Sequence, residues 1–182
     1  MTRLIEIPIE KMTEPQRKLH EKIASGPRGG VRGPFLAWLK SPAYLEKLEE
    51  TGRYLRYDTL FEPRLSEFAI LITARYWGSQ YEWYAHEPLA RKGGLSPEVI
   101  KAVQENRRPA DMAADEEAIY DFCVALHGDH FVSDEVYQNA FEHFGERGLV
   151  ELIGLIGHYT TVSMTLNAFE LQVPEGEEPP LK

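Results

Sequence analysis

The stretch that decides the fold is residues 65–77, Leu-Ser-Glu-Phe-Ala-Ile-Leu-Ile-Thr-Ala-Arg-Tyr-Trp, which is apolar except at four positions. A helix with so few polar side chains has no side suited to water, so the stretch predicts a buried central helix. Residues 149–169 have the same apolar character and are its predicted counterpart. Two buried central helices in one chain indicate a helical bundle.

The rest of the chain carries frequent helix signals, whereas strand signals are nearly absent. β-Branched and polar residues rarely alternate, and no Asn-Gly or Asp-Gly hairpin dipeptide occurs. Capping and proline signals predict helices near 13–26, 42–54, 97–106, 116–128 and 134–144, and a further helix after Ser79, with Asp115 and Ser133 as caps. Residues 26–34 contain too much glycine for a helix. The predicted fold class is all-α.

Composition limits the organisation and the partners of the protein. A chain of 182 residues suits one hydrophobic core, so we predict a single domain over 1–182 with its core at about 30–175. The net charge of -9, with no cluster of Lys and Arg, argues against a nucleic-acid partner. No membrane-spanning run or signal peptide is recognised, so we expect a cytoplasmic protein without a membrane partner. The acidic, proline-rich tail 173–182 should lie extended over its own or a neighbouring subunit.

The single cysteine, Cys123, excludes any mechanism that cycles an intramolecular dithiol. It stands within Asp-Phe-Cys-Val-Ala on a predicted helix, where one thiol usually fills the core. His127 and His130 lie at the end of that helix with no third and fourth ligand, so no metal site is predicted.

Glu82 and His86 are the best candidates for acid–base chemistry. They are four residues apart and therefore share one face of the helix that follows Ser79. A carboxylate beside an imidazole raises the imidazole pKa and fixes its tautomer. The alternative is that Ser79 and Glu82 only cap the helix and that the Glu82/His86 pair is a solvated surface contact. Pro88 follows in the same helix and is expected to kink it.

Four segments together resemble a known superfamily: 64–75 (Arg-Leu-Ser-Glu-Phe-Ala-Ile-Leu-Ile-Thr-Ala-Arg), 81–86 (Tyr-Glu-Trp-Tyr-Ala-His), 90–95 (Ala-Arg-Lys-Gly-Gly-Leu) and 154–159 (Gly-Leu-Ile-Gly-His-Tyr). The chain is similar to the carboxymuconolactone decarboxylase and alkylhydroperoxidase D superfamily over about residues 30–175. This resemblance implies an all-helical fold and a homo-oligomer, a trimer or a hexamer.

The peroxidase branch of that superfamily carries a Cys-x-x-Cys pair, whose positions fall on Ser79 and Glu82, with the histidine on His86 and a relay glutamate on Glu67. Both thiols are absent here, which disfavours peroxidase activity. The decarboxylase branch resembles this chain in having Glu-Trp-x-x-His without thiols. Its substrate is a carboxylated lactone that needs no cofactor, because the electrons released with carbon dioxide flow through an alkene into the lactone carbonyl.

The resemblance implies catalytic roles for three residues. His86 is predicted to donate the proton or to stabilise the oxyanion, Glu82 to orient His86 or relay its proton, and Glu67 to support them from behind. No cofactor is expected. A hydroperoxide-reducing enzyme and a non-catalytic small-molecule-binding protein are the alternatives.

Further residues are predicted to contact a small, anionic substrate. Tyr81 and Trp83 are candidate apolar walls, although aromatic side chains on helices usually pack in a core or an interface. Arg75, or Arg28 and Arg32 from the glycine-rich loop, are candidates to hold a substrate carboxylate; surface salt bridges are the alternative. His158 resembles a position that faces the superfamily's site, and a hydrogen-bonded core histidine is the alternative.

Overall fold

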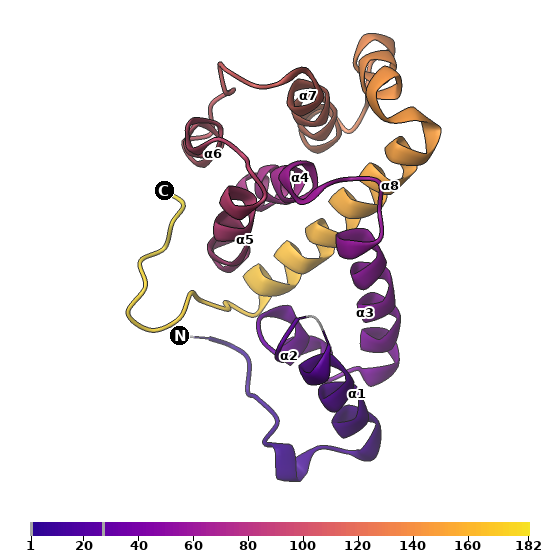
Figure 1. The fold of residues 1–182 in the computed structure, drawn as a ribbon. Helices are drawn as coiled ribbons and strands as arrows, with labels where there is room; N and C mark the ends of the chain where they lie inside the picture. Colours follow the sequence, from indigo (N-terminus) through magenta and orange to yellow (C-terminus); the bar gives the residue numbers. More distant parts are fainter. Residues whose placement is uncertain (1, 27) are drawn as a thin grey trace.

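Helix α4 (Pro63–Tyr76) lies at the centre of the computed structural model, which describes residues 2–26 and 28–182. All ten residues from 65 to 74 are buried. The helix packs against α5 (Gln80–Lys92), α7 (Ala114–Gly128) and α8 (Asp134–Ala168), which surround it in Figure 1. The predicted buried central helix is confirmed, and α4 packs directly against α5 and α8.

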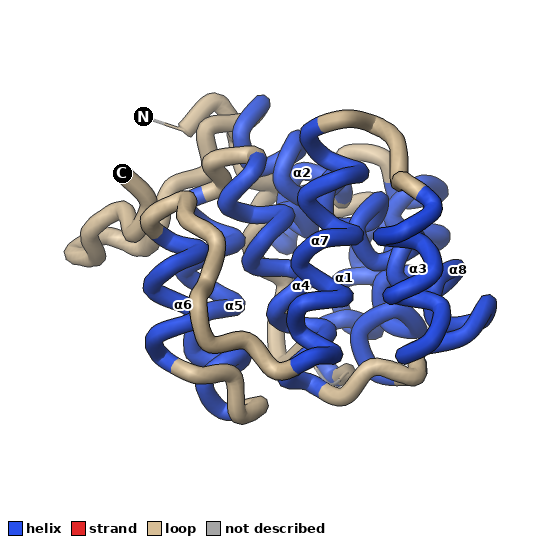
Figure 2. The backbone as a smooth tube through the Cα atoms, turned by 90° about the horizontal axis from the view of Figure 1, so that it is seen from above, coloured by secondary structure: helices blue, strands red, loops and turns tan. Residues whose placement is uncertain are grey.

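The remaining elements are helical as well. They are a 3-10 helix (Ile9–Lys11), α1 (Glu14–Ser25), α2 (Pro34–Trp38), α3 (Pro42–Tyr57) and α6 (Pro97–Gln104). Figure 2 draws only helices and loops, and no strand occurs within residues 2–26 and 28–182. The all-α fold class is therefore confirmed. Helix α2 was not predicted; it begins with Pro34, directly after the glycine-rich loop.

Helix α8 joins two segments that the sequence predicts as separate helices. Gly145 interrupts the helical backbone with φ 64° and ψ 179°, and helix continues on both sides of it. This left-handed region suits glycine, which lacks a Cβ. The segment after the interruption buries one face, including Leu149, Leu152, Leu155 and Tyr159. The predicted second central helix is thus the C-terminal part of α8.

By length and composition α8 is also the one helix of the described residues that could cross a membrane, a feature that the sequence analysis did not recognise. Half of its apolar window is buried inside the protein. It packs against α3, α4 and α7, as the core helix of a helical bundle does.

Two predicted helix caps differ in the structure. Helix α7 begins after Ala113, whose N–H donates to the Glu116 side chain at 3.0 Å. Asp115 therefore lies inside the first turn, where it pairs with Arg64 at 2.5 Å. Ser79 precedes α5 as predicted, but its side chain makes no capping hydrogen bond and its buried hydroxyl has no partner among the described residues.

The C-terminal tail is extended and docks on its own chain. Gln80 holds the backbone of Leu181 with two hydrogen bonds, of 2.9 Å to the carbonyl and 2.8 Å from the N–H. Gln104 donates to the Pro180 carbonyl at 2.8 Å, and the Leu181 side chain is buried. The tail thereby covers the start of α5 and the end of α6, and Figure 1 shows it running alongside them.

Candidate active site

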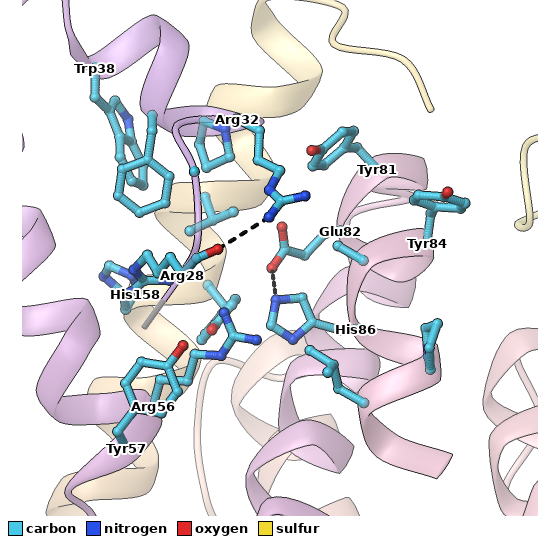
Figure 3. A pocket seen from close by; sticks show the side chains of 18 residues that line it. Arg28, Arg32, Trp38, Arg56, Tyr57, Tyr81, Glu82, Tyr84, His86 and His158 are labelled. Atoms are coloured by element: carbon cyan, nitrogen blue, oxygen red, sulfur yellow. Dashed lines mark hydrogen bonds and ion pairs between the residues drawn. The ribbon is translucent and has the colours of Figure 1, made fainter. Parts of the chain in front are cut away.

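A cavity of about 540 Å³ lies where α3, α5, α8 and the loop before α2 meet. Figure 3 shows the side chains that surround it. Charged and aromatic residues predominate among them: Arg28, Arg32, Phe35, Trp38, Arg56, Tyr57, Tyr81, Glu82, Tyr84, His86, His158 and Tyr159. Such a mixture of apolar walls and a few converging polar groups is typical of a small-molecule site.

His86 is held between two carboxylates at the inner edge of the cavity. Its Nδ1 lies 2.5 Å from Glu67 Oε2 on α4, and its Nε2 lies 2.9 Å from Glu82 Oε1 one turn earlier on α5. All three side chains are buried. Ionised carboxylates accept hydrogen bonds and donate none, so both contacts are satisfied only when both ring nitrogens carry hydrogen. The geometry therefore favours the imidazolium form.

The two carboxylates also explain the proton affinity of His86. Burial by itself lowers the pKa of an imidazole, but the charges of Glu67 and Glu82 and their hydrogen bonds outweigh it and raise the pKa of His86 to about 9. His86 is consequently protonated at neutral pH. The edge of the ring of Tyr159 lies against it, with the ring centroids 5.1 Å apart, which fixes the imidazole from a third side.

Arg56 extends the arrangement from α3. Its Nε lies 3.8 Å from Glu67 Oε1, and the charge of Glu67 contributes to raising the pKa of Arg56 against the opposing effect of burial. The four groups Arg56, Glu67, His86 and Glu82 thus alternate in charge, and all of them except Glu67 line the cavity. Of the two carboxylates, only Glu82 lines the cavity.

This geometry bears on the roles predicted for His86 and Glu82. Because both nitrogens of His86 contact carboxylates, His86 has no free N–H to offer a ligand. The carboxylate that a ligand meets is Glu82, with His86 behind it and Glu67 behind His86. A ligand in the cavity would therefore meet the carboxylate of Glu82, whose neighbour His86 holds a proton.

The predicted substrate contacts divide into two groups. Tyr81, Arg32 and His158 line the cavity. Trp83 does not, because it follows Glu82 by one helical step of about 100° and points into the core, with 1% of its surface exposed. Arg75 lies near the end of α4 outside the cavity lining. Helix α5 continues through Pro88 to Lys92, and Pro88 itself lines the cavity.

Several cavity residues were missed from the sequence. They are Arg56, Trp38, Tyr57 and Tyr159. These residues stand on ordinary amphipathic or apolar helix faces, where no residue spacing identifies them as functional. Tyr159 was the one with a signal, since it follows His158 in a segment that carries the resemblance.

Comparison with known proteins defines the fold. No family profile matches the chain, and no curated protein matches it. Among solved structures, a peroxidase-related protein with an alkylhydroperoxidase AhpD core from Ralstonia eutropha JMP134 superposes with a TM-score of 0.80 at 17% identity, over 96% of this chain and 93% of that one. The chain has the AhpD-like fold.

Two further structures agree with the AhpD-like fold. A peroxidase-related protein from Silicibacter sp. TM1040 superposes with a TM-score of 0.78 at 16% identity, over 96% of this chain and 92% of that one. A protein of unknown function from Agrobacterium tumefaciens gives 0.68 at 19% identity, over 79% of this chain and 99% of that one. At these sequence identities the structural similarity shows the fold alone. The chemistry has to be inferred from the residues of the site.

The raised pKa of His86 predicts a pH-dependent stability. Since its folded-state pKa of about 9 lies above the ordinary value of 6.5, the folded protein holds a proton that the unfolded chain releases between these values. The stabilisation is complete below about pH 6.5 and is lost as the pH rises to about 9. We expect the free energy of unfolding to fall by about 3 kcal/mol across this window. Urea denaturation at a series of pH values measures it.

The matched variants for that series are His86→Gln, which should remove the pH dependence, and His143→Gln on the exposed face of α8, which should keep it. A wild-type stability that is flat between pH 6.5 and 9 contradicts the imidazolium assignment.

Proposed function

We propose that this protein is a cofactor-independent lyase of the carboxymuconolactone decarboxylase type, acting on a small carboxylated lactone or a related ring acid. The observation that carries the proposal is the buried Glu67–His86–Glu82 unit, which opens on the cavity through one carboxylate. Such a unit stores a proton at neutral pH and presents it at a single point, which is what carbon protonation requires.

In the proposed reaction the bond between the ring carbon and the departing carboxylate breaks, and carbon dioxide leaves. The electron pair moves through the conjugated alkene to the lactone carbonyl, which gives a dienolate. The proton of His86 Nε2 passes to Glu82, and Glu82 delivers it to the carbon of the dienolate. Solvent then restores the proton of His86, so that one proton is consumed for each carbon dioxide released.

The charges around the cavity support an anionic substrate. Three arginines, Arg28, Arg32 and Arg56, line a cavity in a protein whose net charge is -9. Clefts lined by one sign of charge concentrate ligands of the other sign. In Figure 3 Arg32 reaches across the cavity toward Glu82, where it is placed to stabilise negative charge that develops during the reaction.

A thiol peroxidase is disfavoured by the state of the one cysteine. Cys123 is fully buried on α7, away from the cavity lining, and burial raises the pKa of its thiol well above the ordinary value. The thiolate is the reactive form, so this side chain is inert toward peroxides. Ser79 and Glu82 occupy the positions of the thiol pair implied by the resemblance.

Substitution of Glu82 tests the proposal most simply. Glu82→Gln keeps the size of the side chain but cannot carry the proton, so turnover should fall by about 10² to 10⁴. His86→Gln should lower it similarly, and wild-type turnover should decline above about pH 9 as His86 loses its proton. The assay is carbon dioxide release from a panel of carboxylated lactones and related ring acids.

The control is Glu87→Gln, on the same helix but outside the cavity lining, which should retain full turnover. Turnover that is unaffected by Glu82→Gln contradicts the proposal. Lactone binding without turnover in the wild type instead identifies a non-catalytic binding protein.

We also propose that the protein works as a homo-oligomer, a trimer or hexamer, in the cytoplasm. One face of α8 supports this assembly, because Val150 and Ile153 are 70% and 51% exposed beside an apolar groove against α3. Apolar surface of this kind usually marks an interface. Sedimentation at micromolar concentration should show a trimer or larger species, and Ile153→Glu should shift it toward monomer. A wild-type monomer would contradict the assembly.

A further inference from the structure

Arg28 lines the cavity but has no specific contact assigned to it in the proposed chemistry. Its Nε and Nη2 are buried and have no hydrogen-bond partner among the described residues. These two nitrogens form one edge of the guanidinium, which donates two parallel hydrogen bonds to a single carboxylate. A buried cationic donor without an acceptor costs free energy, so an unpaired edge of this kind favours a ligand that completes it.

The surroundings hold this guanidinium in a fixed plane. Its carbon lies 4.9 Å from the ring centroid of Phe35 and 6.0 Å from that of Tyr57. The Arg28 carbonyl accepts a hydrogen bond from Arg32 Nη2 at 3.2 Å, which ties down the loop that carries both residues. Because aromatic faces and the loop restrain the side chain, little conformational entropy remains to be lost when a ligand binds.

A histidine completes the same end of the cavity. A Cβ at Gly52 would lie 2.5 Å from His158 Nε2 and 3.3 Å from Arg28 Nη2, so both nitrogens gather over a part of α3 that has no side chain. Burial, and next the charge of Arg28, lower the pKa of His158 to about 4. His158 is therefore neutral at pH 7 and retains one N–H to donate. In Figure 3 this end of the cavity lies away from Glu82 and His86.

We propose that Arg28 and His158 form an anion-binding subsite that anchors the non-reacting end of the substrate through a carboxylate. The Nε and Nη2 edge of Arg28 binds both oxygens of the carboxylate, and His158 donates to one of them. Phe35, Trp38 and Tyr57 surround the flat, apolar part of the ligand next to that carboxylate.

The subsite suits a substrate carboxylate that stays ionised throughout the reaction, rather than the one that leaves as carbon dioxide. An ion pair with arginine stabilises a carboxylate more than it stabilises neutral carbon dioxide. A carboxylate bound to Arg28 would therefore resist being released as carbon dioxide. The reacting group therefore belongs at the other end, beside Glu82. This assignment of ends rests on the proposed function, whereas the binding of a carboxylate at Arg28 does not.

A carboxylate fits better than a phosphate. Recognition at this point comes from one planar fork and one neutral imidazole between aromatic rings. A phosphate has a further pair of oxygens that this arrangement leaves without donors.

Calorimetric titration with benzoate and with its neutral analogue benzamide tests the subsite without any turnover. We expect the wild-type protein to bind benzoate at least about tenfold more tightly than benzamide, as a charge-assisted bidentate contact implies. Arg28→Lys keeps the charge but loses the fork, and Arg28→Gln loses both; each should weaken benzoate binding about tenfold or more. The matched control is Arg53→Lys, an exposed arginine of α3 outside the cavity, which should bind benzoate as the wild type does.

Equal affinity for benzoate and benzamide, or undetectable benzoate binding, overturns the subsite without the need for any variant. The subsite is also overturned if a folded Arg28→Lys protein binds benzoate as tightly as the wild type does. Displacement of benzoate by equimolar inorganic phosphate overturns it as well. The proposed lyase activity is judged separately, from turnover of the wild type and of Glu82→Gln.

Discussion

The contact between His86 and its two carboxylates is the constraint on which the rest of the site depends. Glu67, His86 and Glu82 are all buried, and the imidazolium form leaves no ring nitrogen free. Burying charges costs free energy, and removing one partner of a buried pair typically costs about 3–5 kcal/mol because the remaining charge is uncompensated. The cluster is therefore better explained by what it does with a proton than by a contribution to stability.

The fold supplies these charges from three helices. Arg56 comes from α3, Glu67 from α4, and Glu82 and His86 from α5. Burial of α4 on all sides keeps Glu67 away from water, and the one-turn spacing on α5 keeps Glu82 against His86. At the far end of the cavity the buried Nε and Nη2 edge of Arg28 has no hydrogen-bond partner among the described residues. In the proposed function the protein thus separates a proton-transferring end from an anion-binding end within one cavity.

The sequence predicted the fold class and singled out Glu67, Glu82 and His86 for physical reasons that can be named, but it could not show that the three side chains converge. An apolar stretch with a single carboxylate predicted a buried helix and drew attention to Glu67, and the four-residue spacing placed Glu82 beside His86. It could not predict which of them faces the ligand, because that depends on the rotation of α5 against α3 and α8. The same rotation sends Trp83 into the core, and Arg56 entered the site from a helix whose many charged residues carry no distinguishing pattern.

The protonation state of His86 is the most direct test of this account. Nitrogen NMR of protein labelled with ¹⁵N-histidine reports both ring nitrogens, and the spectrum of His86→Gln assigns the signals. We predict that both nitrogens of His86 carry hydrogen at pH 7.5 and that they titrate together near pH 9. A neutral imidazole at pH 7.5, with one protonated nitrogen and a titration near its ordinary pKa of 6.5, would contradict the account.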